Sequence, residues 1–271
     1  MNIPYVATLQ QHLYIAQLVG PLYYCSLNGD GTLSSCAATG NGFSAPTGIA
    51  FNGNNYAYVT DYYNNAVFLC NVGADGSLSG CASTGSNFQY PWQLAINGST
   101  LYATNAYSTG GVTTCAIGSD GTLSGCTESS GSGTAGIAVG SSYAYIGVGT
   151  STVNLCAVSV TGALSGCAGT GSGFAGVNGI SLAGSYAYFA NQGNGTVDVC
   201  SINPDGSLSA CAASTVGGAP TDVLVQGSQA YVDDASGNIY LCAVGAAGVL
   251  TNCAVSNGGA SFNLGIQIAI H

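Results

Sequence analysis

The segment CSLNGDGTLSSC, residues 25–36, decides the fold, because it returns five more times along the chain. Its copies are CNVGADGSLSGC (70–81), CAIGSDGTLSGC (115–126), CAVSVTGALSGC (156–167), CSINPDGSLSAC (200–211) and CAVGAAGVLTNC (242–253). Successive copies begin 45, 45, 41, 44 and 42 residues apart. Repeats of this length indicate propeller blades, each of which is a small four-stranded sheet.

Two further strand patterns precede the cysteine segments. One is rich in tyrosine, as in NYAYVTD (55–61), and the one before it is short and aliphatic, as in GIAFN (48–52). We therefore predict an all-β, six-bladed β-propeller of four-stranded antiparallel blades, with strands A to D from the centre outward. The predicted blades cover about residues 3–40, 46–85, 91–130, 135–171, 177–215 and 220–257 of a single domain, residues 1–271.

The twelve cysteines form six pairs, and the midpoint of each pair falls at the same place in a turn, as at Asp30-Gly31. An even-length hairpin loop centred there places the two cysteines opposite each other on strands C and D. Pro204 favours four loop residues over two, because proline has no N–H to donate. Opposed Cβ atoms lie about 4.5–5.5 Å apart, which suits a disulfide. We predict one C–D hairpin disulfide per blade: Cys25–Cys36, Cys70–Cys81, Cys115–Cys126, Cys156–Cys167, Cys200–Cys211 and Cys242–Cys253.

Zinc sites are the alternative explanation for regular cysteines. They use shorter cysteine spacings and usually histidine, whereas this chain has only His12 and His271. We predict no metal and no cofactor. Six disulfides require an oxidising compartment, so the expected location is extracellular or at the cell surface.

The charge composition excludes several classes of protein. The 271 residues include no Lys or Arg and ten Asp or Glu, for a formal net charge of −10. A chain without cations offers no surface for nucleic acid phosphates. No run of 18 apolar residues occurs, so we expect no membrane insertion. Residues 1–20 lack the basic and apolar regions of a signal peptide, and we expect none there.

The strand text Tyr58-Val59-Thr60-Asp61, with Tyr188-Phe189-Ala190-Asn191 in register, resembles the YVTN and lactonase-like β-propeller repeats. The hairpin pattern C-x4-D-G-x-L-x-x-C is similar to a secreted, cysteine-stapled branch of those repeats. The resemblance implies the propeller fold. Its lactonase members act through charged side chains, including arginine, that line the central opening. Because this chain has no arginine, we expect that activity to be absent and predict that the protein is not an enzyme.

Few residues suggest a binding or modification site. Trp92 follows Pro91 in a D–A connection, where an aromatic face could stack on a sugar. The sequons Asn97-Gly98-Ser99 and Asn194-Gly195-Thr196 fall in inter-strand loops, which makes Asn97 and Asn194 candidate glycosylation sites.

Counting strands leaves one too many. The segment Ile3–Leu9 supplies strand A of the first blade, yet residues 264–271 repeat the A-strand text a seventh time. Either this surplus strand closes its own ring, or one terminal segment completes a blade of a neighbouring molecule, which generates an open filament. The predicted assembly residues are Leu264, Ile266, Ile268, Ile270, Tyr5 and Val6.

The sparse charge points to self-association. Surfaces made largely of Gly, Ser, Thr, Asn and Tyr pack against copies of themselves with little repulsion. We therefore predict an extracellular structural protein that assembles into a filament, sheath or surface layer through strand exchange or packing of uncharged faces. The alternative is a secreted binding module for glycans or a partner protein.

Overall fold

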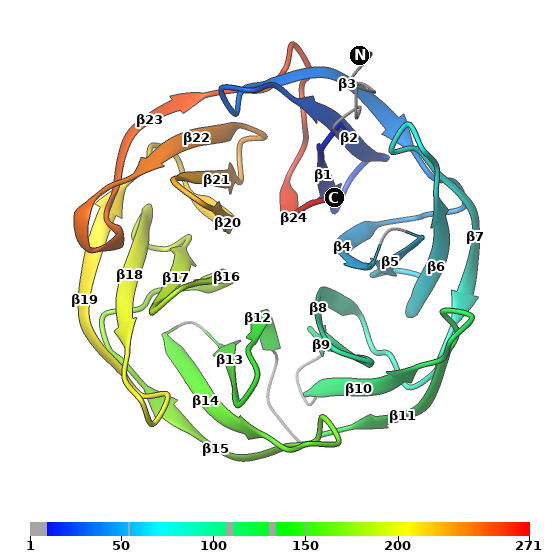
Figure 1. The fold of residues 1–271 in the computed structure, drawn as a ribbon, viewed down its shortest axis with the longest axis horizontal. Coiled ribbons are helices and arrows are strands. Elements are labelled where there is room, and N and C mark those ends of the chain that lie inside the picture. The colour runs from blue at the N-terminus through cyan, green and yellow to red at the C-terminus, as the bar shows by residue number, and fades with distance from the viewer. Residues whose placement is uncertain (1–9, 54, 107–110, 130–133, 150) are drawn as a thin grey trace, which may run out of the picture.

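Six four-stranded antiparallel sheets surround a central axis like the blades of a propeller (Figure 1). The computed structural model describes residues 10–53, 55–106, 111–129, 134–149 and 151–271. The predicted fold class is confirmed. The expected strand at Ile3–Leu9, with Tyr5 and Val6, lies outside the described residues.

Each blade takes its strands in the order A to D from the axis to the rim. The first three blades are β24 (Gly265–Ile270), β1 (His12–Gln17), β2 (Leu22–Leu27), β3 (Leu33–Thr39); β4 (Pro46–Asn52), β5 (Tyr56–Asp61), β6 (Ala66–Val72), β7 (Leu78–Thr84); and β8 (Pro91–Asn97), β9 (Thr100–Asn105), β10 (Val112–Ile117), β11 (Leu123–Glu128). The other three are β12 (Thr134–Val139), β13 (Tyr143–Val148), β14 (Thr152–Val158), β15 (Leu164–Thr170); β16 (Val177–Ala183), β17 (Tyr186–Asn191), β18 (Thr196–Ile202), β19 (Leu208–Thr215); and β20 (Pro220–Gln226), β21 (Gln229–Asp234), β22 (Ile239–Val244), β23 (Leu250–Val255).

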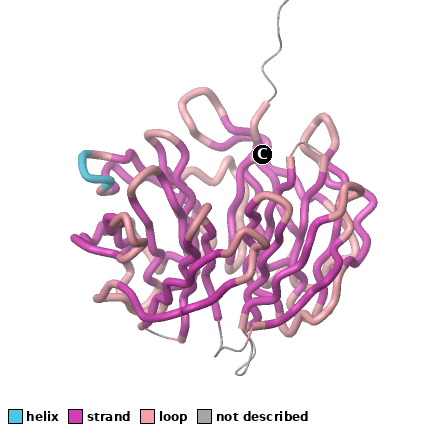
Figure 2. The backbone as a smooth tube through the Cα atoms, turned by 60° about the horizontal axis from the view of Figure 1, so that its bottom comes forward, coloured by secondary structure: helices cyan, strands magenta, loops and turns pink. Residues whose placement is uncertain are grey.

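The strands run between two loop-bearing faces (Figure 2). We call the face with the connections between strands B and C, and from one blade to the next, the B–C face. The C–D face carries the A–B and C–D turns, including the 3-10 turn η1 (Ala246–Gly248).

The hydrophobic core lies between neighbouring blades. Between the first and second blades, for example, Tyr14 and Leu22 pack against Ile49 and Val59, and all four are buried. The B strands bury their tyrosines here because residues at every second position of a strand face the same side. Each blade therefore depends on the next for the burial of its apolar surface.

The buried tyrosines also link the blades through hydrogen bonds. The hydroxyl of a B-strand tyrosine donates to a glycine carbonyl in the C–D turn of the next blade. These bonds are Tyr14 to Gly76 (2.6 Å), Tyr58 to Gly121 (2.6 Å), Tyr102 to Gly162 (2.8 Å), Tyr145 to Gly206 (2.6 Å) and Tyr231 to Gly31 (3.0 Å). The C–D turn of each of these blades thus accepts a hydrogen bond from a tyrosine of the preceding blade.

The six predicted disulfides are confirmed, one in each blade, with Cα–Cα distances of 4.0–4.2 Å. The predicted even-length loop is wrong. The Asn28 N–H donates to Thr32 O, which leaves three loop residues, and Pro204 is the first residue of the equivalent loop. A bulge in strand D restores the pairing, because Tyr24 opposes Ala37 while Ser26 opposes Ser34.

The C-terminal segment closes its own ring. Strand β24 pairs with β1, with Ile268 opposite Ile15, and becomes strand A of the first blade. The predicted surplus strand is therefore part of the ring in the described chain. An alignment of the A-strand text alone pairs Gly265 with Gly48. In the structure, Gln267 takes the place of Gly48, because Gln267 lies opposite Ala16 of β1 as Gly48 lies opposite Thr60 of β5. The true match is shifted by two residues.

Candidate functional site

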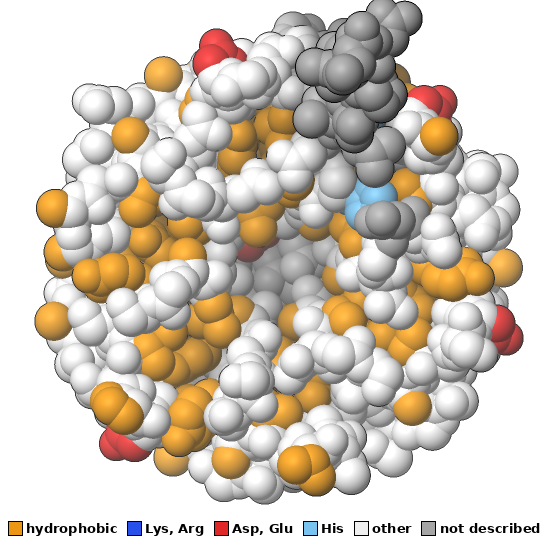
Figure 3. Space-filling view, viewed as in Figure 1, with side chains coloured by type: hydrophobic (Ala, Val, Ile, Leu, Met, Phe, Trp, Pro, Cys, Tyr) orange, Lys and Arg blue, Asp and Glu red, His pale blue; other side chains and the backbone are white. Residues whose placement is uncertain are grey.

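A cavity of about 260 Å³ lies on the axis, lined by A strands from five blades. The hollow and an acidic patch on its wall are visible in Figure 3. Each A strand has an equivalent position beside its bulge, and in three blades a polar side chain from this position reaches the region. That position holds Gly48, Gln93, Gly136, Gly179, Asp222 and Gln267. Glycine in three blades leaves room for the longer side chains of the others.

Gln267 ties the closing strand β24 to two further blades. Its Oε1 accepts the N–H groups of Ile49 and Leu94, each at 3.0 Å, and its Nε2 donates to Leu94 O at 2.8 Å. From the third blade, Gln93 Nε2 donates to Ile266 O at 2.7 Å. These bonds run near the axis, so the first, second and third blades are joined there as well as at their flanks.

Asp222 and Asp233 face each other across strands β20 and β21, where they are register partners. Asp222 is 4 % exposed and Asp233 is 0 % exposed. Asp222 Oδ2 accepts the Ile268 N–H at 2.8 Å, whereas neither oxygen of Asp233 has a partner among the described residues. Asp233 lies directly against Gly265, where a Cβ atom would collide with its carboxyl group. Both carboxyl groups therefore touch the closing strand.

Burial makes the charged form of these two groups unfavourable. Desolvation raises the pKa of Asp222 to about 8, although the N–H of Ile268 opposes the shift. Desolvation, with repulsion from Asp222 and Asp234, raises the pKa of Asp233 well above its usual value. A protonated carboxyl can donate a hydrogen bond or a proton, and Asp222 lines the axial cavity. Sequence analysis did not predict this pairing.

The remaining buried carboxylates of the B strands hold loops. Asp61 accepts the N–H groups of Ser44 (2.6 Å) and Ala45 (3.1 Å), and Asp234 accepts those of Ser236 (2.9 Å) and Asn238 (2.8 Å). Each caps the backbone that enters or leaves its blade. Their role is structural.

The exposed turn aspartates also bind their own backbone. Asp30 Oδ1 accepts the N–H and the hydroxyl of Thr32, at 2.9 and 2.7 Å. The equivalent acceptors in other blades are Asp75, Asp120 and Asp205. These are Asx-type turns, which aspartate favours because its side chain bonds to the backbone two residues on.

Trp92 belongs to an aromatic patch on the B–C face, which we define as Tyr62, Tyr63, Tyr90 and Trp92. The ring of Tyr62 lies 5.2 Å from that of Tyr63, 4.9 Å from Tyr90 and 5.6 Å from Trp92, between centroids. Tyr63 is 59 % exposed, and the buried Nε1 of Trp92 has no partner in the described chain. The sequence pointed to Trp92 alone.

The other blades show that this patch is a local departure from the repeat. Within a blade, the N–H of the residue after strand B donates to the carbonyl of the residue before strand A, and this bond identifies equivalent positions in different blades. Tyr62 corresponds to Leu18, Ala106, Gln192 and Ala235, and Tyr90 corresponds to Leu264, Gly176 and Ala219. Aromatic side chains at both positions occur together at the junction of the second and third blades, which a comparison of the repeats could have revealed.

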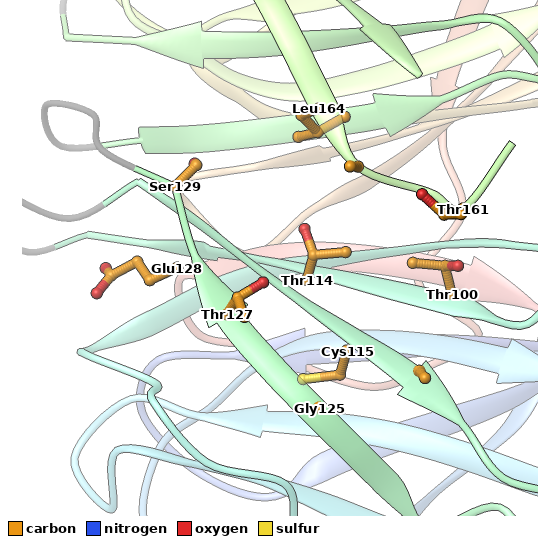
Figure 4. Close-up of a pocket in the computed structure, with 11 residues that line it drawn as sticks. Thr100, Thr114, Cys115, Gly125, Thr127, Glu128, Ser129, Thr161 and Leu164 are labelled. Atoms are coloured by element: carbon orange, nitrogen blue, oxygen red, sulfur yellow. The ribbon is translucent and has the colours of Figure 1, made fainter. Parts of the chain in front are cut away.

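A groove of about 350 Å³ crosses the outer surface where the third and fourth blades meet (Figure 4). Its polar lining is Thr100, Thr114, Thr127, Thr161, Ser129 and Glu128. Glu128 accepts hydrogen bonds from Asn105 Nδ2 (2.9 Å) and Gln89 Nε2 (3.3 Å). These groups hold the end of strand β11, and they do not form a nucleophile with a base.

The structure places the other predicted site residues as follows. Ile266 and Ile268 are buried in the ring, and Leu264 and Ile270 are half-buried. Asn194 is exposed, whereas Asn97 is half-buried and donates from Nδ2 to Gly140 O at 2.9 Å. A glycan on Asn97 would be attached to the nitrogen that makes this contact with the next blade, and Asn194 Nδ2 also donates, to Gly173 O at 3.3 Å.

Neither a metal cluster nor a membrane helix is found in the part of the chain that the structure describes. No group of three His, Cys, Asp or Glu side chains there is arranged to hold a metal ion. No helix in the same residues is long and apolar enough to cross a membrane. Six disulfides are consistent with a secreted protein.

No family model and no curated protein matches the chain. Solved structures share its fold. A putative 6-phosphogluconolactonase from Bacteroides uniformis has a TM-score of 0.71 at 15 % identity, covering 97 % of this chain and 100 % of that one. The periplasmic gluconolactonase of Pseudomonas aeruginosa has a TM-score of 0.66 at 15 % identity, covering 96 % and 98 %. A chain of a nidogen/laminin complex has a TM-score of 0.68 at 15 % identity, with the same coverage.

These neighbours contradict the prediction that the protein is not an enzyme. Propellers that superimpose on nearly the whole chain are named as lactonases, so the absence of arginine is not sufficient to dismiss an activity. Another neighbour comes from a complex with a partner protein. At this low identity the likeness establishes the fold alone. In fold, the chain resembles the lactonase-like β-propellers.

Proposed function

We propose that this protein is an extracellular structural protein whose closed propellers pack against copies of themselves, through the B–C face, into a filament, sheath or surface layer. The placement of charge carries the proposal. Five of the ten carboxylates are buried: Asp61, Asp198, Asp222, Asp233 and Asp234. The five exposed ones are Asp30, Asp75, Asp120 and Asp205 in C–D turns and Glu128 at the end of β11.

Four of the five exposed carboxylates therefore lie in C–D turns, and on the face drawn in Figure 3 the red side chains lie at the rim, apart from the patch in the hollow. With no Lys or Arg in the chain, most of the B–C face carries no charged side chain that must lose water on contact. Two of its exposed apolar residues lie in neighbouring blades, Val19 at 60 % and Tyr63 at 59 % exposure. Such a surface supports association at a small desolvation cost.

Packing of closed rings fits the structure better than strand exchange. In the monomer, β24 already bonds to the first, second, third and sixth blades through its ladder, Gln267, Ile266 and Asp222. An exchanged strand would have to break and remake all of these contacts. The D-strand edges are also poor templates for a partner strand, because each carries a bulge.

Charge added to the B–C face tests the proposal. We expect Val19→Asp combined with Tyr63→Asp to reduce polymers seen by negative-stain electron microscopy and to leave monomeric discs. The matched control is Val160→Asp, because Val160 is fully exposed in the C–D turn of the fourth blade, beside positions where other blades carry aspartate. If both proteins polymerise like the wild type, the B–C face is not the contact.

A cysteine pair distinguishes packing from exchange. Leu13 and Ile270 are register partners on β1 and β24. In polymers of the Leu13→Cys, Ile270→Cys variant, packed closed rings give only monomers on non-reducing gels, whereas exchanged strands give covalent ladders. The single Ile270→Cys variant is the control for adventitious linkage. Ladders that depend on both cysteines would overturn the closed-ring proposal.

The aromatic patch favours a second candidate, a module that binds neutral glycans. Aromatic faces stack on the apolar faces of sugar rings, and the four patch side chains carry no charge. Trp92 is the only tryptophan in the chain, so its fluorescence reports directly on this patch. We would titrate cellohexaose and maltohexaose, expecting a saturable shift that Tyr63→Ala weakens. An unchanged spectrum with both sugars would count against this candidate.

A further inference from the structure

We propose that Asp222 and Asp233 hold the propeller closed in their protonated form, so that ionisation of this carboxyl pair at alkaline pH loosens strand β24. The pair sits at the seam between the sixth and first blades, where β20 and β21 pack against β24. Asp222 bonds to Ile268 and Asp233 lies against Gly265, both in β24. This inference concerns ring closure and is independent of self-assembly.

Charge balance at the seam is the first argument. Two buried carboxylates on adjacent strands would place two negative charges in a region of low dielectric constant. Buried charges normally require a cationic partner or a full set of donors. The chain contains no Lys or Arg, and Asp233 has no donor among the described residues. Protonation removes the charge without any partner.

The surroundings contain no Lys or Arg that would compensate the charge, although hydrogen bonds from Ile268, Val223 and Gln93 favour the ionised form of Asp222. Strands β16 and β24, packed against the pair, carry no titratable residue. The titratable groups on the other strands around it are Tyr231 and Asp234 on β21, Tyr186 and Tyr188 on β17, Asp198 on β18 and Tyr240 on β22. Of these, Asp234 adds repulsion to Asp233. His12 and His271 lie against Tyr24 and Phe51 instead.

The direction of the pH effect follows from linkage. Burial raises the pKa of Asp222 to about 8 and that of Asp233 well above its usual value, whereas an unfolded aspartate titrates near pH 4. The folded state therefore binds these protons more tightly than the unfolded state does. Their contribution to stability is complete below about pH 4 and is lost as the pH rises toward the folded pKa values.

Isosteric amides test the proposal, because Asn is neutral at every pH. We expect the melting temperature of the wild type to fall by on the order of 5–10 °C between about pH 5 and about pH 9. Asp222→Asn and Asp233→Asn should flatten this fall. The control is Asp205→Asn, which removes an exposed turn carboxylate and should retain the slope. Parallel profiles for all four proteins would overturn the proposal.

Hydrogen exchange locates the effect in the wild type and does not depend on the variants folding. After correction for the intrinsic pH dependence, the segment Gly265–Ile270 should lose protection at alkaline pH. The segment Thr134–Val139, an A strand without a carboxylate that lies across the ring from β24 in Figure 1, should not. Equal behaviour of the two segments would refute a specific effect at the seam. Calcium chloride provides a further check at alkaline pH. If it raises the Tm only when both aspartates are present, the pair is a cation site instead, and the proposal is overturned.

Discussion

The hydroxyl of Tyr231 in the sixth blade donates a 3.0 Å hydrogen bond to the carbonyl oxygen of Gly31 in the first, 200 residues away in the sequence. It crosses the seam where the ring closes. Both atoms are part of the repeat, since tyrosines of four other B strands bind the next C–D turn in the same way. Ring closure thus reuses an interaction between consecutive blades.

Removing this hydroxyl should weaken the seam. We expect Tyr231→Phe to lower stability by about 1–2 kcal/mol, because the buried carbonyl of Gly31 loses its donor. Calorimetry should show a melting temperature lower by about 2–8 °C. Tyr63→Phe, at an exposed ring, should leave it unchanged. An equal effect of both substitutions would show that the bond at the seam contributes nothing specific.

Gly265 should tolerate no side chain. A Cβ at this position would collide with Asp233 Oδ2, so Gly265→Ala must displace either the carboxyl group or strand β24. We expect the free energy of unfolding to fall by about 2–4 kcal/mol, as for other strained or overpacked core sites. Gly29→Ala is the matched control, since nothing lies within 4 Å of its Cβ position. Similar denaturant midpoints for the two variants would contradict the close approach.

Each disulfide should stabilise its own hairpin. Replacing both Cys115 and Cys126 by alanine opens a loop of sequence separation 11. We expect the free energy of unfolding to fall by about 2–3 kcal/mol while the remaining five disulfides stay intact. Thermal unfolding of the double variant measures the loss, and non-reducing peptide mapping with a protease other than trypsin checks the other pairs. A disulfide between blades in either protein would contradict the assignment.

The exposed turn aspartates should stabilise the fold at neutral pH and lose this contribution in acid. Hydrogen bonds from Ser77 lower the pKa of Asp75, and the corresponding bonds lower those of Asp30, Asp120 and Asp205. A carboxylate with a lowered pKa adds stability above the unfolded value, near pH 4, and loses it as the pH falls. Asn at all four positions should therefore flatten the fall in melting temperature between about pH 5 and about pH 2. An unchanged acid limb would show that these bonds do not favour the charged form.

The repeat made most of the fold predictable. The six cysteine segments and their period indicated six blades, and the D-G text at the midpoints of the cysteine pairs indicated turns. These are local properties, because residues a few positions apart form them. The odd loop length was missed because the midpoint of a cysteine pair depends only on the number of residues between the cysteines. It does not show whether one of those residues lies in a bulge. A three-residue loop with one bulged residue, such as Ser35, gives the same count as an even loop.

The candidate sites depend on contacts that no local pattern records. Tyr62, Tyr90 and Trp92 come from two connections and meet only when neighbouring blades pack. Asp222 and Asp233 meet across β20 and β21, but their burial depends on β24 from the far end of the chain. By itself, the sequence determined the blades, their disulfides and the absence of compensating cations. Only the tertiary structure decided that β24 closes its own ring and buries the two carboxyl groups, because this follows from the packing of the sixth blade against the first.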